Sequence, residues 1–301
     1  MKAIKNLKIL TLVENMVVGE SWGSWGLSFL LEFQDANGSP KKILFDTGGD
    51  KDVFLHNIKT FDANINDIDA IVLSHGHWDH AGALVEATNI SGGVKLFTHP
   101  HAFFPRYHIN TKGKKREIGI RKEESLDKIE AAGGQVVFSK ESIEIAPGVR
   151  TTGEVPRKSF EKVMELKQGE KLVKNIDGVE TDDFILDDQS LWANVEGIGL
   201  VVLVGCAHAG LLNILDQIAQ IGKFNNFYAV IGGTHLVRRH DAYIERTIEG
   251  LKKYNLKILS PCHCTGFKAT TRLWQSFPNE FYLNYCGREF EIGMLPEQQI
   301  F

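Results

Sequence analysis

The chain has few cysteines, no long apolar run and no large excess of charge, and each lack excludes a class of protein. Four cysteines in 301 residues do not make a disulfide-stabilised secreted scaffold. No run of eighteen apolar residues occurs, so no segment is expected to cross a membrane. The residues that follow Met1 lack the apolar core of a signal peptide, and we therefore expect a cytoplasmic protein. A net charge of −4 gives no reason to expect nucleic acid as a partner.

What remains is an ordinary globular composition, with 43% hydrophobic and 24% charged residues. Strand and helix patterns alternate in the first and last thirds of the chain, as in the apolar strand 200–204 and the helix 211–221 that follows it. The segments near 101–125 and 157–185 are polar and lack periodicity, so we interpret them as surface insertions, which often carry specificity. We expect one α/β (α+β) domain over residues 1–301, with two sheets and helices outside them.

The most informative motif is Ser-His-Gly-His-Trp-Asp-His at residues 74–80, directly after an apolar run that is typical of a buried strand. His75 and His77 alternate, so they can point the same way from an extended segment, and Asp79 and His80 can turn toward the same space where the chain bends. Imidazole and carboxylate groups bind Zn²⁺ at about 2 Å. The motif therefore indicates a metal site, with enough ligands to begin two adjacent ones.

Three later strands also run into a histidine within a few residues; these are His208, His235 and His263. His208 and His263 are interpreted as metal ligands. His235 is a ligand, a proton donor, a substrate contact or a buried histidine of the core, and the sequence leaves these alternatives open.

Three of the four cysteines lie beside these histidines, which indicates reduced thiols near a site. Cys206 is either a small buried hydrophobic residue or a thiolate close to a metal. Cys262 and Cys264 flank His263, and in an extended segment they point away from it, so a structural role is expected for both.

The motif at 75–80, together with Asp46-Thr47-Gly48 and His263, resembles the metallo-β-lactamase superfamily. The resemblance covers nearly the whole chain and implies a four-layer αβ/βα sandwich with the metal site at the sheet edge. Further stretches resemble one subfamily of metal-dependent hydrolases; these are Gly26-Leu27-Ser28 and residues 152–157, 187–191, 205–208 and 262–266. Some of its members carry the label of a synthase that joins a dihydropterin to a ribofuranosylaminobenzene phosphate in a methanopterin-type pathway.

The resemblance implies two divalent ions, with zinc as first choice and manganese or iron as alternatives. By analogy with the family, His75 and His77 share the first ion, while Asp79, His80 and His263 hold the second. The resemblance also implies that Asp46 orients the ligand loop through hydrogen bonds.

The chain departs from the family pattern at two positions. A further histidine is usual where this chain has Glu154, and a bridging aspartate is usual where it has Cys206. We therefore expect His208 to complete the first site. Glu154 either reaches the metals or pairs locally with Arg157.

Four residues are candidates for substrate binding. Trp22 and Trp25 lie in a glycine-rich loop, where they either cover a substrate or pack against the sandwich. Arg106 and Arg157 are candidates for holding an anionic group, because the guanidinium fork matches phosphate oxygens. The basic run 112–122 is interpreted as a solvated loop rather than a phosphate-binding one.

The leading functional hypothesis is a binuclear, zinc-type hydrolase in which a metal-activated hydroxide attacks a small anionic ester or phosphoester and Asp79 handles the proton. The alternative is a transferase that joins a dihydropterin diphosphate to a ribofuranosylaminobenzene phosphate. A nuclease is disfavoured by the acidic balance, and a metal-binding sensor without turnover is the remaining reading. The oligomeric state is left open.

Overall fold

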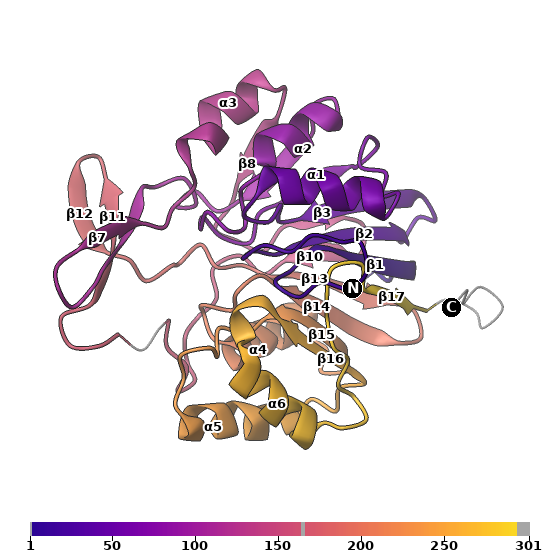
Figure 1. The fold of residues 1–301 in the computed structure, drawn as a ribbon. Coiled ribbons are helices and arrows are strands. Elements are labelled where there is room, and N and C mark those ends of the chain that lie inside the picture. Colours follow the sequence, from indigo (N-terminus) through magenta and orange to yellow (C-terminus); the bar gives the residue numbers. More distant parts are fainter. Residues whose placement is uncertain (1, 164–165, 294–301) are drawn as a thin grey trace.

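The computed structural model describes residues 2–163 and 166–293. Residues 164–165 of the expected second insertion, and both ends of the expected 1–301 domain, lie outside the described residues. Two large sheets face each other at the centre, and helices cover the outer face of each (Figure 1).

The first sheet is built from the N-terminal half and one C-terminal strand, in the order β17-β1-β2-β3-β4-β5-β8. Its strands are β1 (Lys5–Val13), β2 (Ser28–Gln34), β3 (Pro40–Phe45), β4 (Ala70–Val72), β5 (Lys95–Thr98), β8 (Gln135–Phe138) and β17 (Glu289–Ile292). The predicted hairpin joins β2 to β3 as an antiparallel pair, and β3, β4, β5 and β8 run parallel.

The second sheet has the order β16-β15-β14-β13-β10-β9. Its strands are β9 (Glu144–Ala146), β10 (Val149–Thr151), β13 (Leu191–Val195), β14 (Gly199–Val204), β15 (Phe227–Gly233) and β16 (Ile258–Cys262). The strands β14, β15 and β16 are parallel, so their carboxyl ends meet at one edge.

The helices divide between the two outer faces (Figure 1). Those over the first sheet are α1 (Lys51–Thr60), α2 (Leu84–Ile90) and α3 (Leu126–Ala131), and those over the second are α4 (Leu211–Gly222), α5 (Asp241–Lys252) and α6 (Phe267–Ser276); η1 (Lys122–Glu124) and η2 (His263–Thr265) are short 3-10 turns. The inner faces of the sheets pack together through side chains such as Phe29 and Ile231. The four-layer αβ/βα sandwich is thus confirmed.

The two segments interpreted as loops form a third, four-stranded sheet that projects to one side of the sandwich (Figure 1). Its strands are β6 (Arg106–Ile109), β7 (Lys115–Glu117), β11 (Lys171–Ile176) and β12 (Val179–Asp182), in the order β12-β11-β6-β7. The expectation of irregular loops is wrong, because β6 and β11 come from different segments and pair with each other. Pairing of this kind leaves no local periodicity. That both segments are insertions into one domain stays a prediction.

Among the described residues, no helix is both long and apolar enough to cross a membrane.

Candidate metal centre

Asp46, which follows β3 with a positive φ of 59°, anchors both ends of the histidine-rich loop. Its carboxylate accepts hydrogen bonds from the Ser74 backbone N–H (2.7 Å), from Ser74 Oγ (2.7 Å) and from His80 Nδ1 (2.6 Å). The bond to Nδ1 fixes the orientation of the His80 ring and leaves Nε2 free to face inward.

The middle of the loop is held from the other side by Asp187. One Asp187 oxygen accepts from the Gly76 backbone N–H (2.8 Å), and the other accepts from Arg106 Nη2 (2.6 Å). A Cβ at Gly76 would lie 1.8 Å from the Ala102 carbonyl oxygen, so only glycine fits between the two histidines. Arg106 is completely buried and acts through Asp187 rather than facing the surface.

Two pairs of donor atoms, one within the motif and one between the motif and His263, have the spacing of ligands on one ion. Bonds of about 2 Å in a tetrahedron put two ligand atoms about 3.3 Å apart. His75 Nε2 and His77 Nδ1 are 2.9 Å apart, and Asp79 Oδ2 and His263 Nε2 are 3.4 Å apart.

Cys206 lies between these pairs, at the end of β14. His80 Nε2 is 3.2 Å from its Sγ. In each of three groups the donor atoms lie within 4.8 Å of one another; the groups are His75, Cys206 and His208; His80, Cys206 and His263; and Cys206, His235 and Cys264. Cys206 is common to all three, so the thiol occupies the centre of the cluster.

The unpaired nitrogens of the cluster test whether these residues fit a metal. Five buried ring nitrogens of the cluster have no hydrogen-bond partner among the described residues: His77 Nε2, both nitrogens of His208, His235 Nδ1 and His263 Nε2. Burying one such group unpaired costs about 1–3 kcal/mol. Imidazole, thiolate and carboxylate are also the ligands of Zn²⁺. The donor set therefore fits a divalent metal centre.

The charge states of His75, His77 and Asp79 suit metal binding, whereas His80 holds a proton that a bound metal would displace. Burial lowers the pKa of His75, and it lowers that of His77 to about 3, with help from the Arg106 charge, so both rings are neutral as ligation requires. Burial lowers the pKa of His80, but the Asp46 carboxylate raises it more, to about 9. Burial raises the pKa of Asp79, yet His263 and His80 lower it further, below its ordinary range, so Asp79 is a carboxylate.

Cys264 belongs to the cluster, and the expectation that it points away from the site is wrong. His263 has a φ of 51° inside η2, so the alternation of an extended segment does not apply. Cys264 Sγ instead accepts from the His235 backbone N–H (3.2 Å), while Cys262 packs in the core between the sheets.

Two residues that hold His263 are marked by no sequence pattern. Glu14 Oε1 accepts from the His263 backbone N–H (2.6 Å), and Asn15 Oδ1 lies 3.2 Å from its Nδ1. Both follow β1, roughly the length of the chain away, and no motif marks them.

A pocket of about 410 Å³ opens above the cluster. It is lined by Trp25, His77, Trp78, Asp79, His108, Arg116, Ile118, Leu172, Cys206, His208, His235, Val237, Arg238, His263 and Cys264. Of the two candidate tryptophans, Trp25 reaches the pocket, with its ring 4.9 Å from that of His263. Trp22 stacks on His56 at 4.0 Å and does not line it.

Glu154 and Arg157 lie apart from the donor groups. Glu154 pairs with His99 (2.9 Å) and approaches Lys140 (3.9 Å). Arg157 donates to the Ile185 carbonyl oxygen (2.9 Å) and lines a separate pocket of about 750 Å³.

Comparison with known proteins gives the family. Residues 27–169 match the model of the metallo-beta-lactamase superfamily. A Methanocaldococcus jannaschii protein named 7,8-dihydropterin-6-methyl-4-(beta-D-ribofuranosyl)-aminobenzene-5'-phosphate synthase is 35% identical over 296 residues, which cover 95% of this chain and 96% of the relative. An uncharacterised protein of the same organism is 32% identical, over 93% of this chain and 98% of its own length.

Among solved structures, one described as a metal-dependent hydrolase of the beta-lactamase superfamily superposes with a TM-score of 0.79, at 26% identity, over 95% of this chain and 99% of that chain. A metallo-beta-lactamase fold protein from Bacillus subtilis has a TM-score of 0.54 at 12% identity, over 95% of this chain and 99% of its own, and shows the fold alone.

The hydrolase predicted as the main activity is contradicted, because the curated relative that matches almost the whole chain carries the name of a synthase. With this fold, this ligand motif and relatives that match it along nearly its full length, the chain belongs to the metallo-β-lactamase superfamily.

Proposed function

We propose that this chain is a synthase that joins a dihydropterin to 4-(β-D-ribofuranosyl)aminobenzene 5'-phosphate. The observation that carries the proposal is the name of the relative that matches 95% of the chain. A pocket walled by Trp25 and Trp78 above the metal-ligand cluster supports it, because both substrates contain flat rings that stack on indole.

The superfamily generally binds divalent metals, and we propose two ions here, with zinc as first choice. The first would be held by His75, His77 and His208, and the second by Asp79, His80 and His263, with Cys206 between them; Asp46 would position His80. When bound, the ions supply positive charge that stabilises an anionic leaving group.

The joining step balances with a dihydropterin that carries a diphosphate on its 6-methylene carbon. The amine nitrogen of the aminobenzene attacks that carbon, a C–N bond forms and the C–O bond breaks. The diphosphate leaves with the bonding electrons, and the nitrogen loses one proton.

Asp79 is the residue to accept that proton. It lines the pocket and is ionised. An anilinium is a stronger acid than an alkylammonium because the ring delocalises the nitrogen lone pair, so a carboxylate is a sufficient base. Trp25 and Trp78 would orient the two rings and keep water from the reacting carbon.

We place the reaction in the cytoplasm, with small-molecule substrates and no nucleic acid. All four cysteines are free and buried, which agrees with a reducing compartment.

The direct test is an assay of the metal-loaded protein with 6-hydroxymethyl-7,8-dihydropterin diphosphate and 4-(β-D-ribofuranosyl)aminobenzene 5'-phosphate, followed by mass spectrometry and diphosphate detection. We expect the joined product and diphosphate in equal amounts. Asp79→Asn is expected to slow the reaction at least about 100-fold. Diphosphate release that needs no aminobenzene compound would contradict the proposal, because water would then be the acceptor.

A further inference from the structure

Three residues that lie side by side on adjacent strands of the projecting sheet form one wall of the pocket. His108 on β6 lies opposite Arg116 on β7 and opposite Leu172 on β11. Residues directly opposite in adjacent strands share one face of a sheet. All three line the pocket, so this face of the projecting sheet is turned toward the metal-ligand cluster.

A second part of the pocket lining is the loop after β15, which contributes Val237 and Arg238. This loop is fixed to the cluster itself, because the Val237 backbone N–H donates to the Cys264 carbonyl oxygen (3.2 Å). A Cβ at Gly266 would lie 2.7 Å from a Val237 methyl group, so the loop packs closely against η2. Arg238 is therefore presented from a well-anchored segment.

The side chains of Arg116 and Arg238 have no ion pair or hydrogen bond to any other residue that the structure describes. Other arginines bind groups of the protein itself. Arg106 pairs with Asp187, Arg157 donates to a carbonyl oxygen, and Arg272 pairs with Asp241. Within the described residues, Asp79 is the only carboxylate that lines the pocket, and it belongs to the ligand cluster. Within the part of the chain that the structure describes, the pocket thus presents two guanidinium groups that no carboxylate pairs with.

We propose that Arg116 and Arg238 form a phosphate subsite that binds the 5'-phosphate of the ribofuranosylaminobenzene substrate. Guanidinium groups bind phosphate oxygens through paired, charge-assisted hydrogen bonds. The subsite rests on the proposed function for the identity of the ligand, and on the two walls of the pocket for its place.

The arrangement also orients the substrate. The ribosyl phosphate and the amine stand at opposite ends of the benzene ring. With the phosphate held at the outer wall, the amine points inward toward Asp79. The diphosphate of the other substrate belongs at the inner end, beside the metal ligands, so the two anionic groups do not compete for the same charges.

Arg116 and Arg238 take the role, expected from the sequence for Arg106 and Arg157, of holding an anionic group. Arg106 is completely buried against Asp187, and Arg157 lines the other pocket. Arg116 lies in the basic run 112–122 that the sequence indicated as a solvated loop, and its place in the pocket depends on the pairing of β7 with β6.

The test compares two ligands on the metal-loaded protein by isothermal titration calorimetry: 4-(β-D-ribofuranosyl)aminobenzene 5'-phosphate and the same compound without its phosphate. For Arg116→Gln and for Arg238→Gln we expect about tenfold weaker binding of the phosphorylated compound, and about 100-fold for the double variant. Binding of the compound without phosphate, metal content and thermal stability should stay unchanged.

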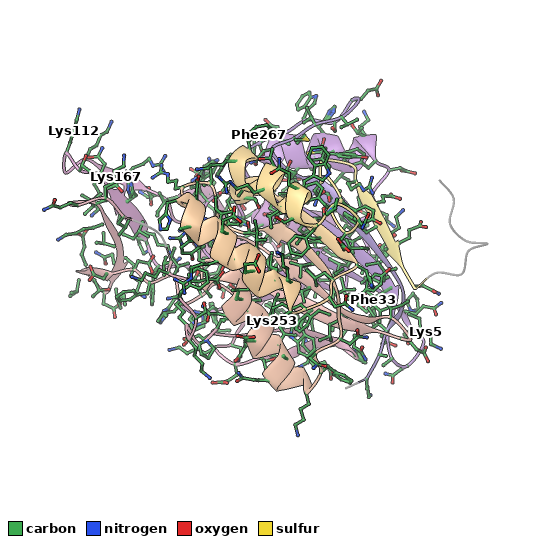
Figure 2. The ribbon with its side chains drawn as sticks, turned by 90° about the horizontal axis from the view of Figure 1, so that it is seen from below. Lys5, Phe33, Lys112, Lys167, Lys253 and Phe267 are labelled. Carbon is green, nitrogen blue, oxygen red and sulfur yellow. The ribbon has the colours of Figure 1, made fainter. Side chains whose placement is uncertain are left out.

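Lys112→Gln is the matched control. It removes one positive charge from the same hairpin, but Lys112 lies at the outer end of the projecting sheet and does not line the pocket (Figure 2). It should bind both compounds as the parent protein does. An equal loss for Lys112→Gln would mean that general charge, not a subsite, is responsible.

The phosphate subsite and the synthase activity can be rejected independently of each other, because the binding measurement does not require the reaction to take place. Selective loss of the phosphorylated ligand without any joining activity would support the subsite and reject the synthase. Joining activity with arginine variants that bind the phosphorylated ligand normally would overturn the subsite. Equal loss of both ligands, or a parent protein that does not distinguish them, would also overturn it.

Discussion

Cys206 is the residue on which the metal centre converges, because it belongs to every donor group of the cluster. Its Sγ is 3.2 Å from His80 Nε2, and Asp46 fixes that ring from the opposite side. A thiolate is a softer and larger donor than the carboxylate usual in the family at this position, and it favours zinc over magnesium or calcium. As a ligand, Cys206 would therefore weigh strongly in the choice of metal.

Replacing Cys206 with alanine should weaken metal binding at least about tenfold and leave fewer ions per chain, because a shared ligand is lost. The measurement is metal analysis by mass spectrometry after dialysis. In the cobalt-substituted protein, the sulfur-to-metal charge-transfer absorption in the near ultraviolet should also fall.

Cys262→Ala provides the matched control, since Cys262 is equally buried but packs in the core between the sheets. It should keep both the metal content and the absorption band. If Cys206→Ala kept the full band as well, Cys264 rather than Cys206 would be the thiolate ligand.

At the scale of elements, helix α4 begins without a cap of its own. Its N-cap residue is Gly210, and the role is taken by Glu161, whose Oε2 accepts from the backbone N–H groups of Leu212 (2.8 Å) and Asn213 (3.3 Å). Asn213 Oδ1 in turn accepts from the backbone N–H of Ser159 (2.7 Å). These bonds hold the segment before residue 164 against the start of the helix.

Glu161→Ala should lower the free energy of unfolding by about 1–2 kcal/mol, because two backbone N–H groups lose their acceptor. Glu161→Gln keeps an acceptor and should lose less. Urea unfolding followed by circular dichroism measures both, and equal losses for the two variants would show that the carboxylate charge, not hydrogen bonding, stabilises the helix.

The contribution of Glu161 to the stability of the fold changes with pH, and the direction of the change follows from its pKa. Burial raises the pKa of Glu161 in the folded protein, although bonds from Leu212 and Asn213 oppose it. The folded state then holds the proton more tightly than the unfolded state, so this contribution to stability is present at low pH and is lost as pH rises through the folded-state pKa. Relative to Glu161→Gln, the parent protein should therefore be more stable at pH 4 than at pH 7.5.

Features that depend on neighbouring residues could be predicted from the sequence, whereas features that depend on distant residues could not. The strands, the hairpin before Lys42 and the histidines at strand ends follow from local patterns, and the structure gathers His208 and His263 with the motif at one edge. Glu161, Glu14 and the pairing of β6 with β11 depend on residues far away in the chain, so no local pattern indicates them. The alternation of an extended strand places Cys264 wrongly, because the positive φ of His263 breaks that alternation.

In the whole molecule, the candidate metal ligands come from both halves of the sandwich. The loop after β4 of the first sheet supplies residues such as His75 and His80, and the strand ends of the second sheet supply Cys206, His208 and His263. Metal bound there would contact both sheets at once, whereas the unfolded chain offers no such preformed site. Metal binding should therefore stabilise the fold as a unit.

Removing the metal with a chelator should lower the melting temperature without unfolding the protein at 25 °C. A ligand at 100 times its dissociation constant stabilises the native state by about 2.7 kcal/mol, which corresponds to a shift of about 4 °C for a chain of this size. Differential scanning calorimetry, with metal analysis of each sample, measures the shift, and added Zn²⁺ should reverse it. The Cys206→Ala variant should show a smaller shift at the same metal concentration, because its affinity is lower. A melting temperature that does not change when the analysis proves that the metal is gone would mean that the two halves hold together without it, and the cluster would then have no part in stabilising the fold.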